Sequence, residues 1–166
     1  YLSSFTMAVF FGASEGMQPL FGQAYGAREG RRIRELLGYA VCTAAVFGLV
    51  WTALAESAPN LFVRIFMTPT DEILRIAPGI IRKYGISFLL LPFNIFSTYY
   101  FQALMRPSAA FTVSVSRGVV VSGILIFLLP AVAGADSIWY ARPITELLAA
   151  VYAAVMMKRC DRALSA

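Results

Sequence analysis

Long apolar stretches separated by short polar segments dominate the sequence. Five of them are long enough to cross a bilayer, because a hydrocarbon core of about 30 Å needs roughly 20 apolar residues in a helix. They cover residues 1–25, 36–57, 80–105, 110–134 and 137–157. The pattern predicts an all-α integral membrane protein with about five transmembrane helices.

The composition agrees with this prediction. Of the 166 residues, 59% are hydrophobic and 14% are charged, whereas about 25% are charged in an ordinary soluble domain. The net charge of +5 does not indicate a nucleic-acid partner, because the basic residues lie between apolar stretches instead of forming a basic helix with interleaved aromatic residues. We expect membrane lipid to surround the chain.

The basic residues also predict an orientation. Arg28, Arg31, Arg32 and Arg34 lie between the first two stretches, and such clusters flank membrane helices on the cytoplasmic side. Alternation of the spans then gives a multi-pass protein of the cell membrane with a cytoplasmic carboxy-terminus.

The longest connection, residues 58–84, contains Pro59, Pro69 and Pro78, which interrupt a continuous helix. Thr70 followed by two acidic residues is typical of a helix N-cap. The segment therefore predicts a short interfacial helix that leads into the third span.

Residues that support catalysis or metal binding are scarce. The sequence has no histidine, which removes the commonest general base. Cys42 and Cys160 lack the spacing of a zinc site or redox pair. We expect neither an enzyme nor a metal or organic cofactor.

Two helical faces carry polar residues that are candidates for a substrate and cation pathway. Glu15 shares a face with Gln18, beside a kink expected at Pro19. A carboxylate within a span is costly and usually faces a cavity or a partner, so both proton exchange and a hydrogen bond to a neighbouring helix remain open. In the third span, three polar residues fall on one face, which favours cavity lining slightly over interhelical packing: Asn94, Thr98 and Gln102.

Small residues in the first span predict close helix packing. Gly12 and Gly16, and again Gly22 and Gly26, have the GxxxG spacing that lets a second helix approach. Pro92 is a candidate kink in the third span.

Arg142 and Glu146 lie one turn apart in the fifth span, so a structural ion pair between them is expected. Arg117 lies near the predicted cytoplasmic end of the fourth span, where we expect it to anchor on lipid phosphates.

Several segments together resemble a known family. These are Gly16-Met-Gln-Pro-Leu-Phe-Gly-Gln-Ala-Tyr-Gly-Ala27, Tyr99-Tyr-Phe-Gln-Ala-Leu-Met-Arg-Pro107, Ser116-Arg117, Leu129-Pro130 and Ile138-Trp-Tyr-Ala-Arg-Pro-Ile-Thr-Glu146. In this order they resemble the carboxy-terminal lobe of bacterial multidrug and toxic compound extrusion (MATE) transporters.

The resemblance implies helices 8 to 12 of a twelve-helix, two-lobe exporter, so that the upstream lobe and one further helix are expected as partners of this chain. It implies export of drugs and other xenobiotics, amphipathic and often cationic, by alternating access and antiport with protons or sodium. Some members carry a cation-site acid in the tenth helix, but the matching span here has no carboxylate and has Met105 where glycine is common. Their coupling residues therefore do not transfer directly.

Two alternatives remain open at this stage. A lipid or polysaccharide flippase of the same superfamily would need several basic residues inside the spans, and only Arg142 and Arg117 qualify. The other is a non-transporting membrane remnant or accessory protein that packs against partners.

Overall fold

The computed structural model describes residues 2–66 and 68–165, and no strand occurs among them. The all-α prediction is confirmed. The elements in chain order are α1 (Leu2–Gly26), α2 (Gly30–Ser57), α3 (Pro59–Phe66), α4 (Asp71–Gly85), the 3-10 turn η1 (Ile86–Leu89), α5 (Leu91–Ala103), α6 (Pro107–Val115), the π-helical turn η2 (Ser116–Val120), α7 (Val121–Ala133), the 3-10 turn η3 (Ala135–Tyr140) and α8 (Ala141–Ser165).

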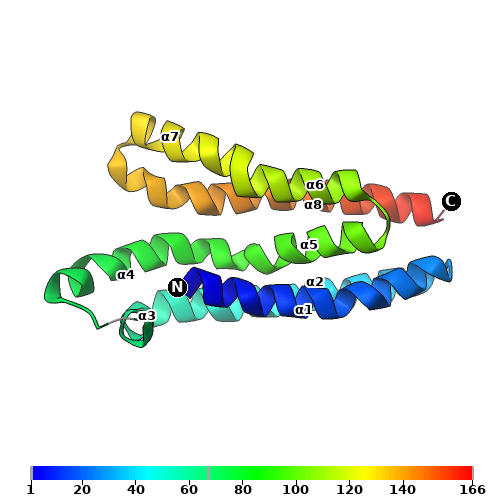
Figure 1. The fold of residues 1–166 in the computed structure, drawn as a ribbon, viewed down its shortest axis with the longest axis horizontal. Coiled ribbons are helices and arrows are strands. Elements are labelled where there is room, and N and C mark those ends of the chain that lie inside the picture. The colour runs from blue at the N-terminus through cyan, green and yellow to red at the C-terminus, as the bar shows by residue number, and fades with distance from the viewer. Residues whose placement is uncertain (1, 67, 166) are drawn as a thin grey trace.

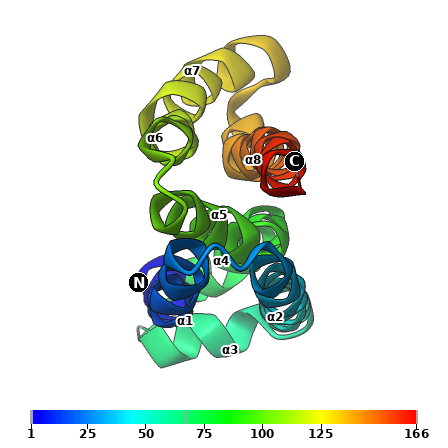
Figure 2. The ribbon, with the colours of Figure 1, turned by 90° about the vertical axis from the view of Figure 1, so that its right-hand side faces the viewer.

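The long helices run along the longest axis of the molecule and alternate in direction (Figure 1). Viewed from one end, α5 lies between the α1–α2 pair and the pair formed by α6 and α8 (Figure 2). It contacts all four of these helices. The helix that carries the predicted polar face is therefore at the centre of the bundle.

Three helical segments are long and apolar enough to cross a membrane: Gly30–Ser57, Asp71–Ala103 and Pro107–Ala133. They correspond to the second, third and fourth predicted spans, and the third and fourth end one or two residues earlier than predicted. The first predicted span corresponds to α1, and the fifth begins in η3 and continues into α8; α1 and α8 are helices of 25 residues each. Their polar residues leave them outside this set, although they are long enough to cross.

The third segment is not one regular helix. Thr70 caps α4, because its hydroxyl accepts a hydrogen bond from the Ile73 amide at 3.4 Å. The predicted helix start is thus confirmed, whereas Pro78 lies inside α4 and does not interrupt it. The helix changes at η1, and α5 then begins with Pro92 in its first turn, where the missing proline amide costs no hydrogen bond.

Among the described residues, two glycines outside the GxxxG pairs are closely packed, and the packing role of the GxxxG pairs remains a prediction. A Cβ atom added to Gly48 would lie 2.4 Å from the Leu89 carbonyl oxygen, and one added to Gly85 would lie 2.8 Å from Ala55 Cβ. These two glycines let α2 approach the break between α4 and α5. An added Cβ would meet no described atom within 4 Å at the four glycines of the predicted GxxxG pairs: Gly12, Gly16, Gly22 and Gly26.

Ion pairs join the helix ends on both sides of the bundle. Arg34 Nε lies 3.6 Å from Asp161 Oδ1 and connects the start of α2 to the end of α8. Lys83 Nζ lies 3.3 Å from Asp136 Oδ2 and connects α4 to η3. Each pair links two segments that the alternation of spans places on one side of the membrane.

Candidate functional site

A charged cluster lies buried where α5, η2 and α8 meet. The Glu146 side chain is fully buried, and two guanidinium groups approach its carboxylate. Arg142 Nη2 lies 3.1 Å from Glu146 Oε1, and Arg117 Nη1 lies 3.8 Å from Oε2. The pair expected between Arg142 and Glu146 therefore has a third charged member.

Asn94 fixes the carboxylate from the central helix. Its side-chain Nδ2 donates to Glu146 Oε2 at 2.6 Å and to the Glu146 carbonyl oxygen at 2.8 Å. Asn94 itself is fully buried. Buried charges persist when they are paired and hydrogen-bonded, and the amide of Asn94 supplies the hydrogen bonds here.

The π-helical turn η2 carries Arg117 at this position. The Val121 amide donates to the Ser116 carbonyl oxygen, five residues earlier, and Ser122 Oγ donates to the Arg117 carbonyl oxygen at 2.5 Å. A single π turn inside an α-helix widens the helix locally and is frequent at functional sites. The π turn of this fold contains Arg117, the only charged residue of the fourth predicted span.

The interpretation of Arg117 as a lipid anchor is wrong. Its side chain is only 14% exposed and pairs with a buried carboxylate, whereas a lipid anchor would extend along the helix to the membrane surface. Pairing across the bundle lowers the cost of placing this charge in the membrane interior, which is about 2.5–3.5 kcal/mol for an unpaired arginine at a helix centre.

A cavity of about 430 Å³ adjoins this cluster. Its volume lies within the range of about 300–1,000 Å³ that is typical of small-molecule sites. Apolar side chains, hydroxyl and amide groups and both arginines share the wall. The lining residues are Met7, Phe11, Ile95, Thr98, Tyr99, Gln102, Ser114, Arg117, Gly118 and Arg142.

The residues predicted for the pathway divide into three groups. Thr98 and Gln102 line this cavity. Glu15 and Gln18 are on α1 and bond to cavity-lining residues: Tyr99 Oη donates to Glu15 Oε1 at 2.9 Å, and Gln18 Nε2 donates to Gln102 Oε1 at 3.4 Å. Asn94 holds Glu146 and is not among the lining residues.

A second cavity, of about 350 Å³, lies nearer η3 and is lined by Tyr84, Ser122, Ile126, Ile138, Trp139, Ala141 and Arg142. Arg142 is the one residue that lines both cavities. Its guanidinium group, held by Glu146, therefore lies at the boundary between them.

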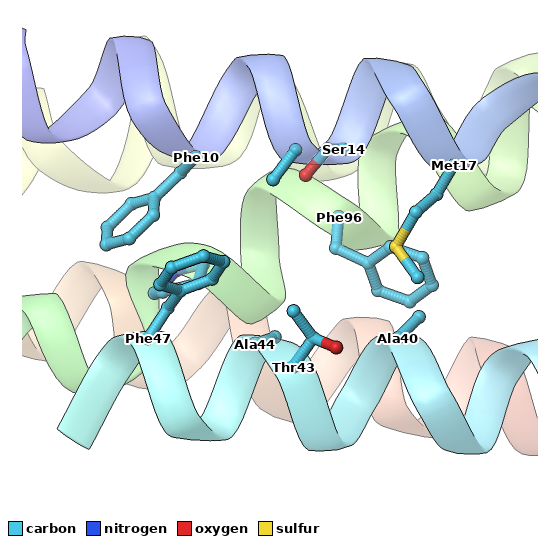
Figure 3. A pocket seen from close by; sticks show the side chains of 10 residues that line it. Phe10, Ser14, Met17, Ala40, Thr43, Ala44, Phe47 and Phe96 are labelled. Atoms are coloured by element: carbon cyan, nitrogen blue, oxygen red, sulfur yellow. The ribbon is translucent and has the colours of Figure 1, made fainter. Parts of the chain in front are cut away.

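A much smaller cavity separates α1 from α2 (Figure 3). At one end of this cavity, Phe10 and Phe47 point toward each other. Met17 and Phe96 lie at its other end. Its volume of about 20 Å³ is enough for about one water molecule. This gap is too small for an organic substrate.

Sequence reasoning did not single out Tyr99 as a lining residue or Arg117 as a partner of Glu146. Arg117 lies 29 positions before Glu146, and no local spacing connects them. The one sequence feature that pointed to Arg117 was its charge within an apolar stretch, which by itself marks a candidate functional residue.

Comparison with known proteins gives one match. The family model described as MatE matches residues 1–129. The matched range includes Asn94 and Arg117, whereas Arg142 and Glu146 lie beyond it. No curated protein and no solved structure matches the chain.

Proposed function

Because the chain belongs to the MatE family of membrane transporters, we propose that it forms the carboxy-terminal lobe of an antiporter that exports drugs and other xenobiotics. The compounds are amphipathic and often cationic, and their export is coupled to the entry of protons or sodium. The complete transporter alternates between outward-open and inward-open states, with the upstream helices forming the other lobe. The protein works as a transporter and not as an enzyme.

The observation that carries this proposal is the 430 Å³ cavity lined by residues of α1, α5, α6, η2 and α8. Apolar and aromatic side chains line it together with hydroxyl, amide and guanidinium groups. Such a mixture suits compounds that have both an apolar body and polar groups.

Glu15 is the candidate coupling residue. It is one of the few acidic residues within the predicted spans, and it is exposed on the surface of α1. Its carboxylate accepts a hydrogen bond from Tyr99, a cavity-lining residue. Binding of a proton or sodium ion at Glu15 would change this bond, which connects the ion to the wall of the substrate cavity.

The flippase alternative receives support from the second arginine. Both Arg117 and Arg142 line the cavity, although Glu146 balances one of the two charges. A large anionic headgroup needs more basic groups than this, so the export of small organic compounds remains the function that the cavity favours.

The test uses the full-length transporter reconstituted in liposomes. Efflux of a fluorescent amphipathic cation is measured under a proton gradient, under a sodium gradient and without either. We expect one gradient to drive transport and Glu15→Gln to remove the dependence on that gradient. Unchanged efflux with unchanged ion dependence in Glu15→Gln would exclude Glu15 from coupling.

The matched control is Gln23→Glu, which places a carboxylate on the exposed surface of the same helix, two turns further along. It should leave the ion dependence as in the wild type. No efflux by the wild-type protein under any gradient would contradict the proposed function as a whole.

A further inference from the structure

We propose that Arg117 and Arg142 form a subsite that binds the acidic group of an amphipathic organic acid. The inference rests on the proposed function, since it assigns a chemical class to the compounds that enter the same cavity. It predicts that a compound with a carboxylate is preferred over an otherwise identical compound without one.

The cluster carries a net positive charge. Two guanidinium groups face a single carboxylate, and Glu146 is the only acidic residue that forms an ion pair with either arginine in the described part of the chain. One positive charge is therefore not balanced within the cluster. An anionic group in the cavity would supply the balance, and in a site of low polarity this attraction is stronger than in water.

Both arginines have a hydrogen-bond donor without a partner. Arg117 Nη1 and Arg142 Nε are buried and have no hydrogen-bond partner. Buried donors are normally paired, and each unpaired one costs free energy. Glu146 Oε1 is also buried without a hydrogen-bond partner, so the carboxylate does not satisfy these donors where it lies. A guanidinium group presents its donors in a planar fork that fits a carboxylate, and an acid group at the cluster would supply further acceptors.

The two arginine side chains lie at the wall of the cavity. They are 14% and 20% exposed, unlike the fully buried Glu146 and Asn94. Both arginines line the large cavity, whereas their two buried partners do not. The cluster therefore presents its positive members to the cavity and keeps its negative member behind them.

The remaining wall defines the rest of the ligand. Met7, Phe11 and Ile95 offer apolar contacts, and Thr98 and Ser114 add hydroxyl groups. A cavity of about 430 Å³ fits one drug-sized molecule. The site thus suits a compact amphiphile with one acid group better than a phospholipid with two acyl chains.

The test compares rhodamine B with its ethyl ester, which keep the same cationic ring system and differ in the free carboxylate. Binding to the full-length transporter in phosphatidylcholine nanodiscs is measured by fluorescence anisotropy. We expect the wild type to bind the acid about tenfold more tightly than the ester. Equal affinity for the two dyes would overturn the proposal without any variant.

Variants then locate the subsite. Arg117→Gln should weaken binding of the acid about tenfold and leave binding of the ester within twofold, which also shows that the variant is folded. Arg117→Lys keeps the charge but loses the fork, and its affinity for the acid should lie between those of wild type and Arg117→Gln. Arg31→Gln, which removes an arginine that is 92% exposed, is the control and should leave the ratio unchanged. An unchanged acid-to-ester ratio in both Arg117 variants would overturn the assignment.

Two further arms separate the remaining explanations. If phosphatidylglycerol in the nanodiscs competes with the acid in the wild type and not in Arg117→Gln, a lipid phosphate and not a small organic acid is the ligand, and the proposal fails. Transport in liposomes separates the failure of the subsite from the failure of the proposed function. If the protein exports both dyes without preferring the acid, only the subsite proposal is wrong. If it exports neither dye, the proposed function as an exporter is wrong.

Discussion

The side-chain amide of Asn94 donates to the Oε2 atom and to the carbonyl oxygen of Glu146, at 2.6 and 2.8 Å. One side chain of α5 thus holds both the carboxylate and the backbone of α8, 52 positions later in the chain. Neither Asn94 nor the Glu146 side chain is exposed. This contact fixes the central helix to the helix that carries the acid.

Asn94→Ala should lower the thermal stability of the full-length transporter in detergent. It removes both donations and leaves a buried carboxylate with fewer partners, at a cost of about 1–3 kcal/mol. The control is Ser97→Ala, one turn further along α5, whose hydroxyl donates only to the Phe93 carbonyl oxygen of its own helix. Equal unfolding temperatures for the two variants would contradict the role of Asn94.

Arg142 and Glu146 should show energetic coupling in a double-mutant cycle. Glu146→Gln leaves two cations without their carboxylate, and breaking a buried pair by removing one partner costs about 3–5 kcal/mol. Adding Arg142→Met removes one of these cations, so the double variant should be more stable than the sum of the single changes predicts. The unfolding midpoints of the four proteins give the coupling, and additive effects would exclude it.

The sequence predicted the local parts of this site and missed the parts made by the fold. Arg142 and Glu146 are one helical turn apart, and Asn94, Thr98 and Gln102 share a helical face, so periodicity alone brings them together. Arg117 joins them only because η2 is a π turn and because α6 and α7 pack beside α8. That contact joins the continuous stretch 107–133 to α8 through tertiary packing, which residue spacing does not encode.

Glycine packing shows the same limit. The GxxxG spacings on α1 stand out in the sequence, yet in the described chain the tight glycine contacts are at Gly48, against the Leu89 carbonyl oxygen, and at Gly85, against Ala55 Cβ. Both lie beside the irregular turn η1. The position of that turn follows from Pro92 at the start of α5, and the neighbour that reaches it is set by tertiary packing.

Gly48→Ala should destabilise the protein. The added methyl group would lie 2.4 Å from the Leu89 carbonyl oxygen, and such overpacking typically costs about 1–3 kcal/mol. Gly38→Ala is the matched control on the same helix, because nothing lies within 4 Å of its added Cβ and alanine favours helix by about 1 kcal/mol. The two variants should therefore shift the unfolding temperature in opposite directions; shifts of the same sign and size would refute the close contact.

Thr70→Ala should lower stability by about 1 kcal/mol, because it removes the side-chain acceptor for the first turn of α4. Thr68→Ala changes the same residue type outside the helix and should have little effect. The readout is the rate of proteolytic cleavage between residues 58 and 70. Fraying at the start of α4 should raise this rate, because it makes the backbone before the helix more accessible to the protease. Equal cleavage rates in the two variants would argue against the cap.

The most direct test of the account is whether a transported compound occupies the cavity beside Arg117 and Arg142. Cysteine is placed at Gln102, a cavity-lining position, in full-length protein that lacks Cys42 and Cys160. Arg31→Cys, at a side chain that is 92% exposed in the polar segment between the first two predicted spans, is the control. We predict that a water-soluble maleimide labels both variants, that rhodamine B slows the labelling of the Gln102 variant, and that the Arg31 variant shows no such protection. Labelling at Gln102 that rhodamine B does not slow, at concentrations that saturate its transport, would contradict the account.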